Sequence, residues 1–87
     1  MITGKIVIET NTSTFDILGY YYKGNDGKEY FHQAYYGTNI LDPAIGYWDF
    51  EDYNGEQHCF VDYDETVDKK MKRLRNKFST WEIVSQN

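Results

Sequence analysis

The chain has 87 residues, 40% of them hydrophobic and 18% aromatic, with a formal net charge of −5 at pH 7. This composition excludes a disordered tail, and the length predicts one small domain over residues 1–87. The single cysteine excludes an internal disulfide, no apolar run approaches membrane-spanning length, and residues 1–6 lack the pattern of a signal peptide. We therefore expect a soluble cytoplasmic protein.

The first part of the chain predicts a strand and then a β-hairpin. β-Branched residues over 2–10 are typical of a strand, and a polar cluster at 11–14 is expected to form a turn. Residues 15–23 and 28–36 are expected to pair around a turn centred on Asp26-Gly27. The aromatic residues then divide between two faces, with Tyr20, Tyr22 and Phe31 on one and Tyr21, Tyr30, His32 and Tyr36 on the other. One sheet layer cannot bury both faces, so some of these side chains should be exposed or covered by a partner chain.

Residues 37–44 are expected to connect this hairpin to the next one. Pro43 cannot donate a ladder hydrogen bond and should end regular pairing there. We expect Ile40 and Leu41 to pack beneath the connection.

Residues 46–63 predict a second hairpin, which is both acidic and aromatic. Asn54-Gly55 favours a two-residue type I′ turn, because both of its central residues need a positive φ. In the resulting register the core face holds Trp48, Phe50, Cys59 and Val61. The opposite face then carries Tyr47, Asp49, Glu51, Tyr53, His58, Phe60 and Asp62.

The C-terminal part predicts one helix and a last strand. Residues 64–78 are expected to be helical, with Asp64 as N-cap and an apolar stripe of Val67, Met71, Leu74 and Phe78. Residues 81–85 are typical of a short strand. The predicted fold class is therefore α+β, with an antiparallel sheet of about five to six strands that includes two β-hairpins. One C-terminal helix packs on one face, in the order β-ββ-ββ-α-β.

Charge is strongly divided along the sequence. Residues 42–68 contain nine acidic residues and no Lys or Arg, whereas residues 69–77 contain six basic residues and no acid. We expect helical ion pairs from Glu65 to Lys69 and from Asp68 to Lys72. An uncompensated acidic surface repels nucleic acid and attracts basic proteins, so we do not expect direct nucleic acid binding.

No pattern in the sequence indicates catalysis. His58 and Cys59 are neighbours in a predicted strand, so their side chains should point to opposite faces and cannot pair. Asp49, Glu51 and Asp62 are close across the hairpin, but exposed strands offer no desolvated cleft in which a carboxylate pair could share a proton. We expect the protein not to be an enzyme.

No metal or cofactor is expected either. His32, His58 and Glu51 are possible ligands, but their spacing matches no known metal motif. Residues 25–27 and 62–64 each resemble a fragment of a calcium loop, without the ligand series that ends in a bidentate glutamate.

The function predicted from these features is binding to a larger, basic, nucleic-acid-handling protein. The acidic face is either an ordinary solvent-exposed face or a binding surface, and its aromatic side chains favour the second interpretation. We assign partner binding to Tyr47, Asp49, Glu51, Asp52, Tyr53, Glu56, Phe60 and Asp62. In size, charge and aromatic content the chain resembles small phage- or mobile-element-encoded inhibitors, such as DNA-mimic, anti-restriction and anti-CRISPR proteins, although no motif assigns it to a family. The alternative is a homodimeric ligand-binding or structural module that uses the aromatic hairpin at 15–36.

Overall fold

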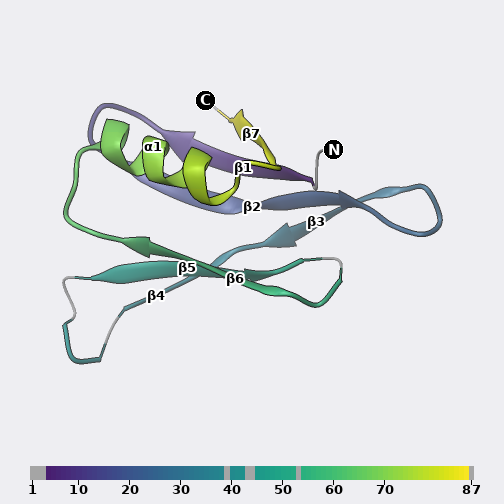
Figure 1. Cartoon of the computed structure of the whole chain (residues 1–87), viewed down its shortest axis with the longest axis horizontal. Coiled ribbons are helices and arrows are strands. Elements are labelled where there is room, and N and C mark those ends of the chain that lie inside the picture. The colour runs from purple at the N-terminus through teal and green to yellow at the C-terminus, as the bar shows by residue number, and fades with distance from the viewer. Residues whose placement is uncertain (1–3, 39, 43–44, 53, 87) are drawn as a thin grey trace.

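The computed structural model describes residues 4–38, 40–42, 45–52 and 54–86 (Figure 1). Its elements are β1 (Lys5–Thr10), β2 (Phe15–Lys23), β3 (Glu29–Gln33), β4 (Tyr35–Thr38), β5 (Gly46–Glu51), β6 (Gln57–Asp62), α1 (Val67–Lys77) and β7 (Glu82–Ser85). The α+β class and the C-terminal helix are confirmed. Among the described residues the helix is too short to cross a membrane.

The strands form two sheets and not the one sheet predicted. One has the order β3-β2-β1-β7 and the other the order β4-β5-β6. Of the pairs, β1 with β7 is parallel and the others are antiparallel. The two sheets are joined through the 29–38 segment, because its first half pairs with β2 and its second half pairs with β5. The expected strand at 28–36 is therefore shared between two sheets.

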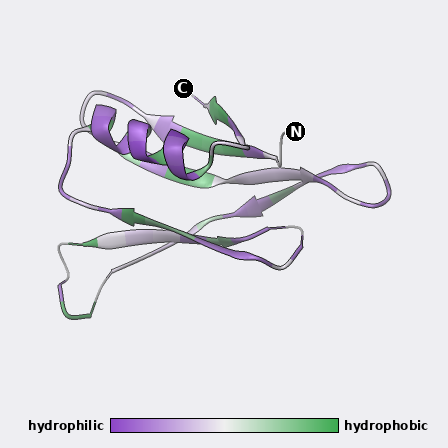
Figure 2. Cartoon of the chain, viewed as in Figure 1, coloured by the Kyte–Doolittle hydropathy of each residue, from purple (hydrophilic) through white to green (hydrophobic). Residues whose placement is uncertain are grey.

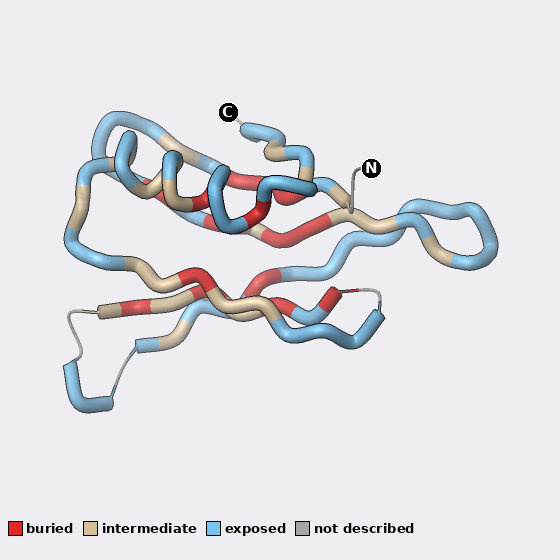
Figure 3. Tube along the Cα trace, in the orientation of Figure 1, coloured by how far each residue is buried: buried red, intermediate tan, exposed pale blue. Residues whose placement is uncertain are grey.

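One hydrophobic core fills the space between the two sheets and α1. The buried chain segments in Figure 3 face this space from both sheets. Phe15 of β2 contacts Trp48 of β5 and Phe60 of β6, with ring centroids 5.4 and 5.7 Å apart. The helix contributes Leu74, and its C-cap Phe78 is also buried, while most of the helix ribbon is coloured hydrophilic in Figure 2. The predicted apolar stripe on the helix is thus confirmed.

Both hairpins have three-residue loops, where we expected two-residue turns. The N–H of Gly27 donates to the carbonyl of Gly24 at 3.0 Å, and the N–H of Gly55 donates to that of Asp52 at 2.9 Å. Both Gly27 and Gly55 have a positive φ, +80° and +81° respectively, as the last residue of such a loop requires. A type I′ turn would also need a positive φ at Asn54, and no described residue other than glycine has one.

The longer loops shift each register by one residue, which turns one strand of each hairpin over. Phe60 now lies opposite Trp48 and His58 opposite Phe50, so Phe60 and His58 face the core. Cys59 and Val61, predicted to be in the core, lie on the outward face. In the first hairpin Phe31 lies opposite Tyr21 and not on the face of Tyr20. Tyr30 and His32 correspondingly share the inner face with Tyr20 and Tyr22, whose rings they contact.

The helix begins later than predicted, because Thr66 and not Asp64 is its N-cap. The Thr66 Oγ1 accepts a hydrogen bond from the N–H of Lys69 at 3.3 Å. Glu65 pairs with Arg73 at 2.7 Å, where we expected Lys69. Arg73 lies about two helical turns after Glu65 and also contacts β6.

Candidate protein-binding surface

The outward face of the β4-β5-β6 sheet, called the outer face below, is the part of the predicted site that the structure retains. Tyr47, Asp49 and Glu51 alternate with buried residues along β5 and therefore project from this face together. The register adds residues from the neighbouring strands, namely Tyr35, Gly37, Gln57, Cys59 and Val61. The face thus combines aromatic side chains with carboxylates.

Two tyrosines dominate the exposed aromatic part of the outer face. Tyr35 lies opposite Asp49 and is 72% exposed. The ring of Tyr47 lies over Gly37, where an added Cβ would come within 2.8 Å of it. Any larger residue at position 37 would push this ring away, so Gly37 keeps Tyr47 close against the sheet.

Asp49 contacts its cross-strand neighbour Cys59. The two residues are directly opposite on β5 and β6, and their side chains are hydrogen-bonded. Burial, followed by the interaction with Asp49, raises the pKa of the Cys59 thiol above its ordinary value. This thiol is therefore protonated near neutral pH and is not an activated nucleophile.

The basic residues of α1 are directed at the edge of β6. Arg73 donates to the Val61 carbonyl at 2.7 Å, and Lys77 donates to the Cys59 carbonyl. Lys70 pairs with Asp62 at 2.6 Å. Three of the six basic residues in 69–77 thus contact β6, so the helix does not present all of its positive charge to solvent.

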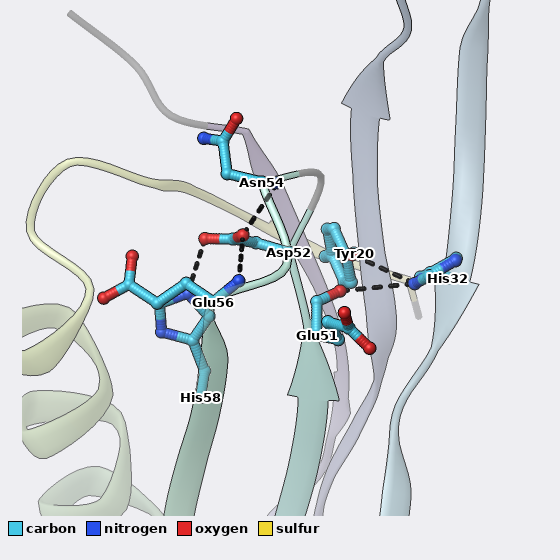
Figure 4. A network of polar contacts seen from close by, with 7 residues as sticks. All are labelled: Tyr20, His32, Glu51, Asp52, Asn54, Glu56 and His58. Atoms are coloured by element: carbon cyan, nitrogen blue, oxygen red, sulfur yellow. Dashed lines mark hydrogen bonds and ion pairs between the residues drawn. The ribbon is translucent and has the colours of Figure 1, made fainter.

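Asp52, predicted to be an exposed carboxylate, is instead buried, with only 8% of its surface exposed. Its Oδ1 accepts the N–H groups of Asn54 and Glu56, both at 2.9 Å, and its Oδ2 lies 2.9 Å from His58 Nε2 (Figure 4). Burial acts to raise the Asp52 pKa, but the hydrogen bonds from His58 and the two N–H groups outweigh it, and the pKa is lowered. Asp52 holds the turn together and is not available to a partner.

Four other predicted site residues remain, and none of them is shown on the outer face. The prediction that Phe60 is an exposed anchor is wrong, because the register shift leaves it only 1% exposed. Asp62 lies on the core-facing side at the end of β6, where it pairs with Lys70 and accepts a hydrogen bond from the Tyr36 hydroxyl at 3.3 Å. Glu56 is exposed at the hairpin loop. Tyr53 lies outside the described residues.

Asp52, Glu56 and His58 form the metal-ligating group found in the described part of the chain. Their ligand atoms lie within 4.8 Å of one another, a separation that one divalent cation can bridge. However, Oδ1 of Asp52 already accepts two N–H groups and its Oδ2 accepts from His58. The hydrogen bonds that stabilise the loop therefore account for the positions of the Asp52 and His58 side chains.

A second polar network connects the two sheets beside this loop. The Tyr20 hydroxyl lies 3.0 Å from His32 Nδ1, which is 3.2 Å from the Glu51 carbonyl (Figure 4). Burial, with smaller contributions from nearby Tyr22 and acidic groups, raises the pKa of Tyr20 to about 12. Tyr20 is therefore a neutral hydrogen-bonding group that links β2, β3 and the end of β5.

The exposure of Ile40 and Leu41 was not predicted from the sequence. Both were expected to be packed, yet they are 97% and 94% exposed. With the exposed Tyr35 and Tyr36 they belong to a stretch without charge, residues 30–41. That absence of charge in an acidic chain was the available signal.

Comparison with protein-family models finds no match, and comparisons with curated proteins and with solved structures find no significant similarity.

Proposed function

We propose that the chain is a small acidic protein-binding module that inhibits a larger, basic, nucleic-acid-handling protein in the cytoplasm. The outer face of the β4-β5-β6 sheet would occupy the basic surface that otherwise holds nucleic acid. This is the role of the phage- or mobile-element-encoded inhibitors that the chain resembles in size and charge. The observation that carries the proposal is that Asp49, Glu51, the exposed Tyr35 and the partly exposed Tyr47 share a face whose strands contain no Lys or Arg.

The arrangement of the face supports recognition of a basic surface. Asp49 and Glu51 are two residues apart on one strand, which separates them by roughly 6.6–6.8 Å and lets one partner contact both carboxylates. Tyr35 and Tyr47 beside them supply a large, rigid contact area. Protein interfaces are enriched in such aromatic residues. The carboxylates would steer a basic partner towards the face and repel free nucleic acid.

Affinity capture from a nuclease-treated extract of the native host tests the proposal. The test variant is Asp49→Asn with Glu51→Lys, in which asparagine keeps the size of Asp49 and an acceptor for Cys59. The matched control is Lys69→Glu with Lys72→Glu, two exposed positions on α1. We expect wild type and control to capture the same basic protein and the test variant to lose it. If the helix variant loses the captured protein and the outer-face variant retains it, the binding site is on α1 and not on the outer face.

Captured protein must also show the inhibition. Adding the chain to the purified partner should displace bound nucleic acid, and the outer-face variant should not. Capture without any effect on nucleic acid binding would leave a binding module and contradict the inhibitory role.

The homodimeric alternative, through the 15–36 hairpin, is supported by one exposed aromatic pair. Tyr21 and Phe31 contact each other on the outward side of β2 and β3, with ring centroids 4.9 Å apart. The other face of this hairpin is covered at Tyr20, which contacts Phe50 and Trp81. A monomer in equilibrium sedimentation at high micromolar concentration would remove this alternative.

A further inference from the structure

The two edges of the β4-β5-β6 sheet differ in whether another part of the chain covers them. The β6 edge is covered, because Arg73 and Lys77 of α1 bond the Val61 and Cys59 carbonyls. Such covering prevents edge strands from pairing with other chains. At the β4 edge, no described residue of this chain adds a strand beyond β4. β4 also contains neither Pro nor a charged residue to discourage pairing.

The register identifies the backbone groups on this open edge. Asp52 donates to the Glu56 carbonyl, so even-numbered residues of β5 face β6 and odd-numbered residues face β4. In β4, Tyr35 and Gly37 are opposite odd-numbered residues and bond towards β5, so the N–H and C=O groups of Tyr36 and Thr38 point away from it. The outward Val61 and Cys59 carbonyls agree with the same alternation in β6.

The free edge begins where β4 diverges from β2. Ala34, just before β4, still donates to the Leu18 carbonyl of β2 at 3.0 Å. Beyond that point β2 and β4 separate, as Figure 1 shows. One edge of the 29–38 segment pairs with β2 along β3. Tyr36 and Thr38 lie on that same edge within β4, where β2 is no longer beside it.

We propose that an extended, basic segment of the partner protein pairs with the free edge of β4 as an added strand. Its basic character rests on the proposed function and on the carboxylates near β4. Glu9 and Asp16, opposite each other on β1 and β2, are exposed. Burial, Asp62 and Asp16 together raise the pKa of the Tyr36 hydroxyl, so Asp16 lies close to β4, whereas Asp62 already pairs with Lys70. Main-chain hydrogen bonds would supply affinity, and lysine or arginine side chains would meet these carboxylates.

Exposed apolar side chains provide the remaining contact area. Tyr35 and Tyr36 are 72% and 53% exposed, and Ile40 and Leu41 follow the strand almost fully exposed. Since a buried tyrosine covers about 150–250 Å², the two tyrosines alone offer roughly 200–300 Å². A second copy of the chain would bring the same carboxylates to this edge and repel the first, so a basic segment is the better occupant.

The probe for this proposal is an acetylated and amidated peptide of ten alternating lysines and valines. A counterpart is N-methylated at two neighbouring central residues, which removes a donor from each edge while keeping the charge. Binding is followed by NMR titration, together with amide hydrogen exchange at Tyr36 and Thr38. The test variant is Thr38→Pro, which removes an outward N–H without removing a bond to β5, and Thr38→Ala is its matched control.

We expect the unmethylated peptide to bind saturably and to slow exchange at Tyr36 and Thr38. N-methylation and Thr38→Pro should each weaken binding about tenfold or more, the effect of losing one hydrogen bond and leaving its partner unpaired. Thr38→Ala should change it less than about threefold. Unchanged melting of Thr38→Pro confirms that it folds, and the methylated peptide tests pairing without any change to the protein.

Three results of these experiments would overturn the proposal. They are no saturable binding, equal binding of both peptides, and a concentration-dependent dimer that Thr38→Pro abolishes, which would make a second copy the occupant. If the Asp49→Asn and Glu51→Lys variant loses the partner while Thr38→Pro keeps it, strand addition fails and the proposed function stands. If the Thr38→Pro variant loses peptide and partner while the acidic variant keeps both, the added strand stands and the acidic face is not the site.

Discussion

Replacing Phe60 by alanine should cause a severe loss of stability. Phe60 is 1% exposed, and its ring lies 5.7 Å from that of Phe15 and 6.3 Å from that of Trp48. The Arg73 guanidinium covers it at 4.4 Å. Deleting a buried Phe side chain costs about 3–5 kcal/mol, a large part of the roughly 5–15 kcal/mol that stabilises a typical domain. At about 4–8 °C per kcal/mol, the melting temperature should fall by roughly 12–40 °C.

The matched control is the neighbouring Val61→Ala. Val61 is only partly buried and lies on the outer face, so its truncation should cost about 1 kcal/mol or less. Urea titrations followed by circular dichroism give both values. If Val61→Ala costs as much as Phe60→Ala, the hairpin has the two-residue turn and the opposite register, and the assignment of the outer face is refuted.

Three further outcomes follow from the buried contacts. Asp52→Asn should lower the unfolding free energy by about 1.5–3 kcal/mol at pH 7. Because folding lowers the Asp52 pKa, the stabilisation from its carboxylate is present above pH about 4 and is lost as the pH falls below that. The difference in unfolding free energy between variant and wild type should therefore shrink in urea titrations at pH 3. Native Cys59 should react with iodoacetamide at pH 8 more slowly than in urea, and Asp49→Asn should speed the native reaction, because burial and Asp49 raise the thiol pKa. Arg73→Ala should cost about 1.5–3 kcal/mol in a thermal or urea melt, since it removes hydrogen bonds to Val61 and Glu65, with Arg73→Lys in between.

Local patterns in the sequence were sufficient for most elements. The β-branched and aromatic run at 15–23 coincides with β2, and the spacing of Val67, Met71, Leu74 and Phe78 identifies the face that α1 packs on the core. These properties depend on periodicity within one segment. They hold whichever segment packs opposite.

Register could not be derived in the same way. Asn54-Gly55 fits the end of a three-residue loop as well as the centre of a two-residue turn, because each needs glycine at position 55. The two registers bury either Cys59 and Val61 or His58 and Phe60, and both sets include apolar residues. A strand has a period of two, so one residue of loop length decides which set is buried. The Asp52 side chain held the available signal, since aspartate commonly accepts an N–H two residues further on.

The division into two sheets depends on contacts between distant segments. Residues 28–36 have the composition of one strand, and nothing local indicates that the chain passes from β2 to β5 at Ala34. This passage exposes the β4 edge, and it also places Tyr35 beside Asp49 on the outer face. Those two features of the candidate site were therefore beyond prediction from single-segment patterns.

The most direct test of the account is the association rate of the captured partner with the chain, measured by stopped flow over a range of salt concentrations. If Asp49 and Glu51 steer a basic partner, the wild-type rate should fall steeply as the Debye length shortens from about 10 Å at 0.1 M to about 3 Å at 1 M salt. The Asp49→Asn and Glu51→Lys variant should associate more slowly at low salt and depend less on salt, while Lys69→Glu with Lys72→Glu should retain the wild-type dependence. A wild-type rate that is independent of salt, or equal to that of the outer-face variant at low salt, would contradict the claim that the outer face of the β4-β5-β6 sheet is the binding surface.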